Sequence, residues 1–129
     1  MQPGELLWTP PPDRIRRANV TALAEWLARE RGKHFADYHA LWRWSVEDLE
    51  GFWQALWEYF AIESSAPHTR VLGRRSMPGA EWFPAARLNY AQHILRGERA
   101  GGDVLLHLSE TRPLSALPWT TLGLSLIHI

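Results

Sequence analysis

Residues 45–60 read SVEDLEGFWQALWEYF, and this stretch decides most of the fold that the sequence predicts. Its apolar residues recur at intervals of three and four, which is the spacing of one helix face. Ser45 and Asp48 fit the Ser-x-x-acid pattern of a capping box, and acidic side chains in a first turn complement the helix dipole. We therefore predict a helix from Val46 to about Ala61. Its buried stripe would consist of Leu49, Phe52, Trp53, Leu56, Trp57 and Phe60.

The chain before this helix carries two more helical patterns. One runs over Asp13–Arg31, with Asp13 as its cap and Gly32 as a natural stop. Asn19 and Thr21 can interrupt it, because both side chains compete for backbone hydrogen bonds. A short helix is predicted over Ala36–Trp44.

The chain after residue 61 is less regular. Ile62–Ala80 contains prolines and glycines and is predicted to be a linker or irregular loop. A helix is predicted over Arg87–Arg96. Val104–Leu108 is the first predicted strand, and its lack of strict alternation favours burial on both faces. Arg112–Pro113 is predicted to be a turn, and Leu117–Trp119 a short extended piece before a helix capped at Thr120.

These patterns predict an α+β chain that is mostly helical, with one or two short strands at its C-terminal end. Residues 1–12 form an extended, proline-rich arm, because consecutive prolines lack donors and restrict their neighbours. Residues 124–129 differ in character from the rest and resemble a translated adaptor tail, so we interpret them as non-native.

The composition limits the class of protein. The 129 residues are 46% hydrophobic and 22% charged, which is typical of a globular domain rather than a disordered chain. Fourteen basic residues balance fourteen acidic ones, so there is no overall drive toward nucleic acid or an anionic membrane. The sequence has no cysteine, which excludes disulfides and cysteine-based zinc sites. No apolar run is long enough to span a bilayer and no secretory signal is visible in residues 1–12, so we expect a cytoplasmic protein without a membrane partner.

Charge and aromatic residues are unevenly distributed. Residues 14–43 and 70–99 carry an excess of bases, whereas residues 45–63 carry five acids and no base. Mutual attraction of these segments is the favoured interpretation, and a basic patch for a phosphate-bearing ligand is the alternative. Eight tryptophans indicate either an aromatic core or a surface for a partner.

The position of each tryptophan separates these two alternatives. Trp53 and Trp57 share the predicted apolar stripe, so we assign them to the core and not to a nucleic-acid stacking surface. Trp53→Ala would then cost roughly 3–5 kcal/mol. Trp42 and Trp44 are undecided, because residues two apart cannot share one helix face.

No constellation of residues indicates catalysis. The sequence has no phosphate-binding loop of the Gly-x-x-x-x-Gly-Lys-Ser/Thr type and no Gly-x-Gly-x-x-Gly motif. Lys33 is expected to be solvated, Ser45 is explained by its cap, and Glu110 by a strand-end turn. The histidines lack the spacing of a metal site; they are His34, His39, His68, His93, His107 and His128. We therefore predict no catalytic, cofactor-binding or metal-binding residue in this chain.

A series of short motifs, in order along the chain, resembles a known family. The motifs are Leu7-Trp8-Thr9-Pro10, Ala18-Asn19-Val20-Thr21, Asp37-Tyr38-His39-Ala40-Leu41, Trp44-Ser45-Val46-Glu47-Asp48, Phe52-Trp53-Gln54-Ala55-Leu56-Trp57, Met77-Pro78-Gly79-Ala80, Trp82-Phe83-Pro84 and Arg87-Leu88-Asn89-Tyr90-Ala91. They resemble the N-terminal region of acetoacetyl-CoA synthetases, which are acyl-adenylate-forming ligases close to acetyl-CoA synthetase. The resemblance covers nearly all of residues 6–122. Pro118 departs from it, because a threonine is expected there.

The resemblance implies a two-step reaction for a complete enzyme. Acetoacetate and ATP would give an acyl-adenylate and pyrophosphate, and CoA would then displace AMP, with magnesium accompanying the nucleotide. The family's phosphate loop, acidic nucleotide motifs and adenylation lysine have no counterpart here, so no ATP-, magnesium- or CoA-binding residue is carried over. The acyl substrate is open between acetoacetate, acetate and other short acids.

The resemblance also implies a domain organisation. Residues 13–96 would be a helical N-terminal cap region, and residues 97–123 the truncated start of a large α/β domain whose remainder is the expected partner. On this interpretation the chain is a ligase fragment that is not active alone. The alternative is a standalone, tryptophan-rich binding module without enzymatic activity.

Overall fold

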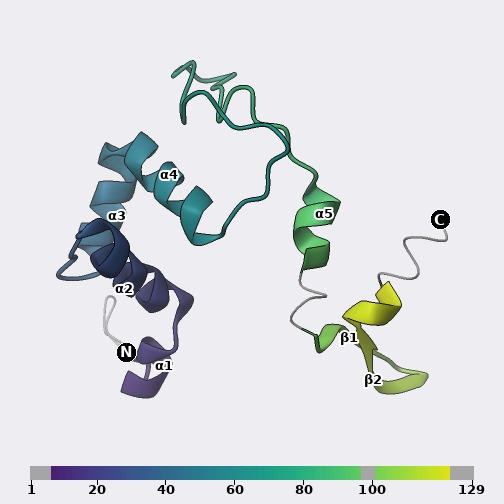
Figure 1. The fold of residues 1–129 in the computed structure, drawn as a ribbon. Coiled ribbons are helices and arrows are strands. Elements are labelled where there is room, and N and C mark those ends of the chain that lie inside the picture. Colours follow the sequence, from purple (N-terminus) through teal and green to yellow (C-terminus); the bar gives the residue numbers. More distant parts are fainter. Residues whose placement is uncertain (1–6, 97–100, 123–129) are drawn as a thin grey trace. The chain divides into compact units, whose positions relative to one another are not determined.

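The computed structural model describes residues 7–96 and 101–122, which form helices α1 to α5, strands β1 and β2, and a helical stretch over residues 119–122 (Figure 1). The chain divides into two compact units. The helical unit contains the described residues up to 61 together with residues 70–82. The ribbon unit contains residues 62–69 and the described residues from 83 onward. No helix in the described ranges is long and apolar enough to cross a membrane.

Helix α1 spans Pro12–Arg16 and ends the extended arm one residue earlier than predicted. The prediction that Asp13 caps this helix is wrong. A proline occupies the first helical position, where its missing N–H would have had no partner in any case. Asp13 instead lies in the first turn and forms an ion pair with Arg16.

Helix α2 spans Asn19–Arg31, so the single helix predicted from Asp13 is broken in two. The Thr21 hydroxyl donates to the Ile15 carbonyl oxygen at 2.7 Å, a local bond that competes with helix continuation as the sequence suggested. At the other end Gly32 adopts a left-handed conformation (φ 61°), which confirms the predicted stop.

Helices α3 (Tyr38–Glu47) and α4 (Leu49–Tyr59) follow one another with only Asp48 between them. The long amphipathic helix is therefore confirmed, but its predicted start at Ser45 is wrong. Ser45 lies inside α3, where its hydroxyl donates to the Trp42 carbonyl oxygen at 2.7 Å. Because α3 continues past the predicted boundary, the next helix can begin only after the chain leaves helical geometry at Asp48.

Asp48 is the N-cap of α4. Its carboxylate accepts from the Gly51 amide at 3.0 Å and from the Trp44 indole N–H at 2.9 Å. The carboxylate fills the space beside Gly51, where an added Cβ would lie 2.7 Å from the Asp48 Cγ. One acidic side chain thus starts α4 and fixes an aromatic ring of α3.

The core of the helical unit is small. It is formed by Leu27 of α2, Leu41 of α3 and Ala55 of α4, all buried. Half-buried side chains pack around it: Leu23, Trp26, Phe35 and Trp44. The predicted stripe of α4 is only partly buried, because Trp53 is 40% exposed and Phe60 51%. Two covering helices are too few for a stripe of six large side chains.

Residues 70–82 form a folded-back loop in the same unit. Leu72 and Trp82 pair as an isolated bridge, and the Gly73 amide donates to the Glu81 carbonyl oxygen at 2.8 Å. Val71 and Leu72 are both buried. The part of the predicted irregular linker that follows residue 70 is therefore held by backbone pairing and by buried side chains.

In the ribbon unit, helix α5 spans Tyr90–Leu95 and is shorter than the predicted Arg87–Arg96. Its start is set by Asn89, whose side chain accepts from the Gln92 amide at 3.1 Å. An asparagine cap requires extended backbone at its own position, so the helix cannot begin earlier.

Strands β1 (Asp103–Ser109) and β2 (Arg112–Pro118) pair antiparallel. Two short C-terminal strands are thus confirmed. The predicted turn at Arg112–Pro113 is wrong, because both residues belong to β2 and the chain turns at the two residues before them. Burial of the first strand on both faces is also wrong here: every β1 residue except Val104 is exposed, since a two-stranded ribbon has no layer of its own to cover it.

Candidate functional site

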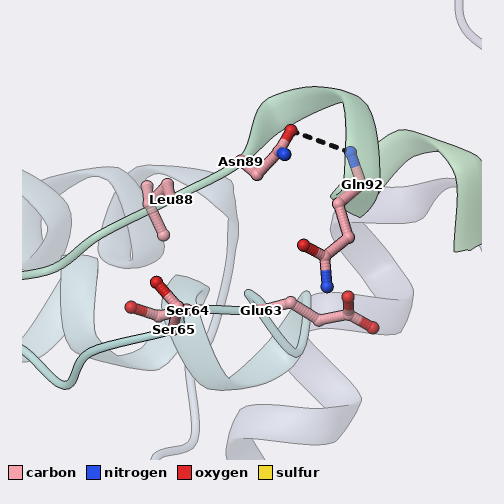
Figure 2. A pocket seen from close by; sticks show the side chains of 6 residues that line it. All are labelled: Glu63, Ser64, Ser65, Leu88, Asn89 and Gln92. Carbon is pink, nitrogen blue, oxygen red and sulfur yellow. Dashed lines mark hydrogen bonds between the residues drawn. The ribbon is translucent and has the colours of Figure 1, made fainter.

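A cleft of about 350 Å³ lies within the ribbon unit. Figure 2 shows the residues that line it, from the loop before residue 66 and from the start of α5. They are Glu63, Ser64, Ser65, Leu88, Asn89 and Gln92. Five of the six side chains are polar, so the cleft offers hydrogen-bonding groups beside the apolar Leu88.

Backbone pairing holds the two walls of this cleft together. The Ser65 amide donates to the Arg87 carbonyl oxygen at 2.9 Å, and residues Ala66 and Arg87 form an isolated bridge. The Glu63 amide donates to Nδ1 of His93 at 3.4 Å, which ties the loop to α5. The cleft is therefore a built feature of the unit.

The side chains of the cleft do not form a nucleophilic constellation. The Ser64 and Ser65 hydroxyls donate to the carbonyl oxygen of Arg87, at 3.1 and 3.3 Å. Nδ1 of His93 accepts from a backbone amide. A nucleophile needs a base within hydrogen-bond reach, whereas both of these serine hydroxyls donate to backbone oxygens. The chemistry available to the cleft is binding through hydroxyl, amide and carboxylate groups.

Ser45 and Asp48 both form structural hydrogen bonds in the helical unit. Ser45 donates to a backbone oxygen within α3, and Asp48 is occupied as a cap. The Trp44 indole N–H first, then the Gly51 amide and the Lys33 charge, hold the pKa of Asp48 below its ordinary value of 3.8. A carboxylate held so firmly in its charged form is a poor general base, because its affinity for a proton is reduced.

Lys33 and the histidines are dispersed. The Lys33 ammonium lies 4.9 Å from the centre of the Trp44 ring, a cation–π contact. His39 packs edge-on to Tyr38, and His68 edge-on to Phe83. His34 and His107 are exposed, and His128 lies outside the described residues. Among residues 7–96 and 101–122, no three His, Cys, Asp or Glu side chains are grouped as metal ligands.

Glu110 is exposed at the turn that joins β1 and β2. This is the strand-end turn that the sequence favoured for it.

An ion pair joins a basic and an acidic segment. Arg31 at the end of α2 contacts Glu58 of α4. The Gln54 side-chain amide first, and then Arg31, hold the pKa of Glu58 below its ordinary value. This contact supports the interpretation that oppositely charged segments attract one another, although it involves only one of the predicted pairs of segments.

Aromatic rings form a connected series in the helical unit. Phe35, Trp44, Phe52, Trp53 and Trp82 follow one another with neighbouring ring centres 5.3–5.6 Å apart. The series leads from the core outward, because Trp44 is half-buried whereas Trp53 and Trp82 are 40% and 41% exposed. The assignment of Trp53 to the core is therefore wrong.

Further aromatic side chains of this unit are exposed. They are Trp8, Tyr38, Trp42 and Phe60. Trp42, left undecided by the sequence, faces outward, whereas Trp44 packs inward. Large exposed apolar side chains of this kind are candidates for contact with another surface.

Comparison with known proteins connects these features to a family. The family described as "Acetyl-coenzyme A synthetase N-terminus" matches residues 38–94. The acetoacetyl-CoA synthetase of Streptomyces lividans superposes with a TM-score of 0.80 at 43% identity, over 90% of this chain and 18% of that one. The chain is homologous to the N-terminal region of acetoacetyl-CoA synthetases. This confirms the resemblance carried by the ordered motifs.

Sequence comparison with other acetoacetyl-CoA synthetases supports the same homology. The Rhizobium meliloti protein is 32% identical over 95% of this chain, and the Danio rerio protein 30% identical over 84%. The chain spans about a fifth of the length of these relatives, 19% and 16% respectively. The homology therefore concerns one region of a much longer synthetase.

The region matched by the synthetase family runs from the start of α3 into α5. It includes the aromatic series from Trp44 to Trp82 and all residues that line the cleft. Sequence reasoning missed the cleft, because its walls come from a loop without a motif. The Asn-x-x-Gln pattern of Asn89 and Gln92 was the available signal, since it marks a helix start.

Proposed function

We propose that this chain acts as the N-terminal segment of an ATP-dependent acetoacetate–CoA ligase. The complete enzyme would convert acetoacetate, ATP and CoA into acetoacetyl-CoA, AMP and pyrophosphate. The observation that carries the proposal is the superposition on the Streptomyces lividans synthetase, at 43% identity over 90% of this chain. A cytoplasmic location would suit a ligase that consumes ATP and CoA.

Within that enzyme the segment would have a structural role. We propose that residues 13–96 cover the large α/β domain and that residues 97–123 begin that domain. The described residues offer no glycine-rich phosphate loop and no cluster of acids suited to ATP with magnesium. No step of the reaction is therefore assigned to them, and the nucleotide, magnesium and CoA would be held by the remainder of the ligase.

The exposed aromatic surface supports this role. Trp53 and Trp82 are large side chains left about 40% exposed beside one another. Burial of such rings against another surface contributes strongly to association. The remainder of the ligase would provide that surface.

The test is a chimera with a synthetase of known structure. This chain replaces the matching 18% of the Streptomyces lividans protein, and acetoacetate-dependent release of pyrophosphate is measured. We expect the chimera to be active, whereas the same synthetase without any N-terminal segment is inactive. A soluble, folded chimera without activity would contradict the proposal.

A second assay separates the roles of the two parts. The purified chain alone is expected to release no pyrophosphate with acetoacetate and ATP. Activity of the chain alone would overturn its assignment as a structural segment.

A standalone binding module is the second candidate, and the exposed Trp8 and Trp42 favour it. A module of this kind would melt cooperatively and bind little hydrophobic dye, because its own core would suffice. Strong dye binding by the chain alone, relieved in the chimera, would favour the ligase segment.

A further inference from the structure

Three arginines lie close together where the helical unit begins. Arg14 and Arg16 belong to α1, Arg17 follows it, and Asp13 is the only acidic residue between positions 7 and 24. Arg16 takes the Asp13 carboxylate as its ion-pair partner. Among the residues that the structure describes, Arg14 and Arg17 form no ion pair with a carboxylate. The described chain therefore leaves two positive charges without a neutralising partner at this place.

A hollow of about 420 Å³ lies beside these two side chains, at the junction of α1 and α2, which are both labelled in Figure 1. It is lined by Arg14, Arg17, Ala18 and Asn19. The chain bends here because Ala18 has extended backbone (ψ 140°) between the two helices. The bond from the Thr21 hydroxyl to the Ile15 carbonyl oxygen, at 2.7 Å, holds this bend. The hollow thus follows from the break between two helices.

Each guanidinium group is held by a contact that leaves N–H donors available. The Arg14 Cζ lies 5.8 Å from the centre of the Trp8 ring, which is a cation–π contact and uses no carboxylate. Arg17 donates from Nε to the Asp13 carbonyl oxygen at 3.4 Å, so its two Nη groups stay available. Side chains three residues apart lie on the same side of a helical turn. The two guanidinium groups can therefore act on one ligand.

The chemistry of this hollow suits a phosphate group. A guanidinium group offers a planar fork of donors that matches two phosphate oxygens, and hydrogen bonds between charged groups are about twice as strong as those between neutral groups. A phosphate has enough oxygens to accept from both arginines. The side-chain amide of Asn19 lines the same hollow and adds another donor. The first turn of α2 carries no acidic side chain that would repel an anion.

We propose that this hollow binds a water-soluble phosphate ester or diphosphate, whose oxygens accept from the guanidinium groups of Arg14 and Arg17. Its volume is in the range of small-molecule sites, so it has room for more than a single phosphate group. The proposal narrows the phosphate-binding alternative for the basic segment 14–43 to two arginines. It goes beyond the proposed function and does not rest on it, because it uses only residues of this chain.

Nuclear magnetic resonance of the isotopically labelled full chain tests the proposal. Pyrophosphate is added stepwise, and the backbone amide signals of residues 17–19 and the side-chain Nε–H signals of Arg14 and Arg17 are followed. We expect these signals to shift until they saturate. Pyrophosphate should bind at least about threefold more tightly than inorganic phosphate, because it brings more charge and more acceptor oxygens. Sodium chloride at the same ionic strength should cause no saturable shift, and saturation by chloride would overturn phosphate recognition.

Single substitutions assign the binding to the two arginines. Arg14→Gln and Arg17→Gln should each weaken pyrophosphate binding about tenfold, as expected for the loss of hydrogen bonds to a charged group. Arg14→Lys keeps the charge without the fork and should weaken binding about threefold. Arg43→Gln is the matched control, because Arg43 of α3 is also exposed and in no ion pair of the described residues. Equal losses for Arg14→Gln, Arg17→Gln and Arg43→Gln would indicate a general effect of charge and overturn the site.

A lipid surface is the other possible source of phosphate. Vesicles of phosphatidylcholine and phosphatidic acid in equal amounts present a phosphate monoester at their surface, and their binding is measured by co-sedimentation. We expect saturable binding of pyrophosphate and no co-sedimentation that depends on Arg14 and Arg17. Co-sedimentation without saturable pyrophosphate binding would overturn the water-soluble ligand.

The chimera with the Streptomyces lividans synthetase separates this proposal from the proposed function. Pyrophosphate is titrated into the chimera by calorimetry, and into the same chimera carrying both Arg14→Gln and Arg17→Gln. We expect the parent chimera to show one binding event that the double variant lacks. An active chimera in which both titrations are identical would overturn the site in the complete enzyme and leave the ligase role intact. An inactive, folded chimera that still shows the extra binding event would contradict the ligase role alone.

Discussion

The helical unit and the ribbon unit differ in how they bury apolar side chains. The buried hydrophobic residues of the described chain all belong to the helical unit: Leu27, Leu41, Ala55, Val71 and Leu72. In the ribbon unit most large apolar side chains of both strands are exposed instead, such as Leu108 at 71% and Leu114 at 64%. Hydrogen bonds are formed in both units, so the contrast concerns hydrophobic packing.

This difference shows how one chain can be well packed in one part and sparsely packed in another. Helices satisfy their backbone groups internally, and three of them suffice to enclose a few side chains. A ribbon of two strands has two open faces, and burial of both requires layers from elsewhere in a sheet protein. The helical unit should therefore carry most of the chain's own stability.

The sharpest test of this contrast compares a buried with an exposed leucine. Leu27→Ala should lower the free energy of unfolding by about 2–5 kcal/mol, because Leu27 is fully buried in the core. Leu114→Ala in β2 should change it by less than about 0.5 kcal/mol. Denaturant titration followed by circular dichroism measures both. Equal losses would show that the ribbon packs as firmly as the helices.

Trp53→Ala tests the boundary of the helical core. Because Trp53 is 40% exposed and stacks on Trp82 at 5.4 Å, we expect a loss of about 1–2 kcal/mol, below the value for a fully buried ring. The double variant with Trp82→Ala should reveal a coupling of about 0.5–1.5 kcal/mol. A loss of 4 kcal/mol or more would show that Trp53 is buried in the core, which contradicts its exposure in the structure.

Substitutions of Asp48 test the junction between α3 and α4. Asp48→Ala should cost about 1 kcal/mol, because the Gly51 amide loses its acceptor. Asp48→Asn keeps an acceptor and serves as the control, with an expected cost of a few tenths of a kcal/mol. Thermal unfolding at neutral pH measures both. Equivalent behaviour of the two variants would mean that charge, and not capping, matters at this position.

The pH dependence of the same residue follows from its lowered pKa. The folded state favours the charged carboxylate, so this stabilisation is fully present above the unfolded-state pKa of about 4. It is lost as the pH falls from about 4 through the lower folded-state pKa. Stability curves of the wild type and Asp48→Asn should converge in this acidic range. Divergence there would contradict the assignment.

The smallest expected effect concerns the ion pair between Arg31 and Glu58, which are 32% and 41% exposed. A double-mutant cycle should give a coupling of about 0.2–1 kcal/mol that weakens with added salt. The pair of Arg29 and Glu30, more exposed at 67% and 49%, is the control and should show less coupling. A coupling that does not respond to salt would indicate a buried contact.

Local signals in the sequence predicted the elements well. The three- and four-residue spacing before Tyr59 predicted the amphipathic helix, and Gly32 predicted the end of α2. Both signals act through the backbone within one turn. The resemblance carried by the ordered motifs was equally informative, because homology to the synthetases confirms it.

Features set by neighbours could not be predicted in the same way. Ser45 has the residue type of a cap, but it lies inside α3, which continues to Glu47. Trp53 lies on an apolar stripe, but its exposure depends on how many helices cover that stripe. Residues 112–113 were predicted to be a turn because proline is disfavoured inside a sheet. Strand β2 has a paired neighbour on one side only, and proline is tolerated in such an edge strand.

The candidate cleft shows the same limit. The predicted helix over Arg87–Arg96 supplied one wall only approximately, because its start at Asn89 was not predicted. The opposite wall depends on pairing between residues more than twenty positions apart, such as Ser65 and Arg87. No local spacing encodes that pairing. The prediction that the chain holds no catalytic residue stays a prediction, to be decided by the assay of the chain alone.

The close approach of Asp48 to Gly51 has a consequence for how this sequence can vary. An alanine at position 51 would normally favour a helix, yet here its methyl group would displace the carboxylate that starts α4. The two positions should therefore change together in descendants of this gene: a larger residue at 51 becomes acceptable only where position 48 no longer supplies the cap. Replacement of that glycine alone would be selected against, although the helix it belongs to would tolerate it in isolation.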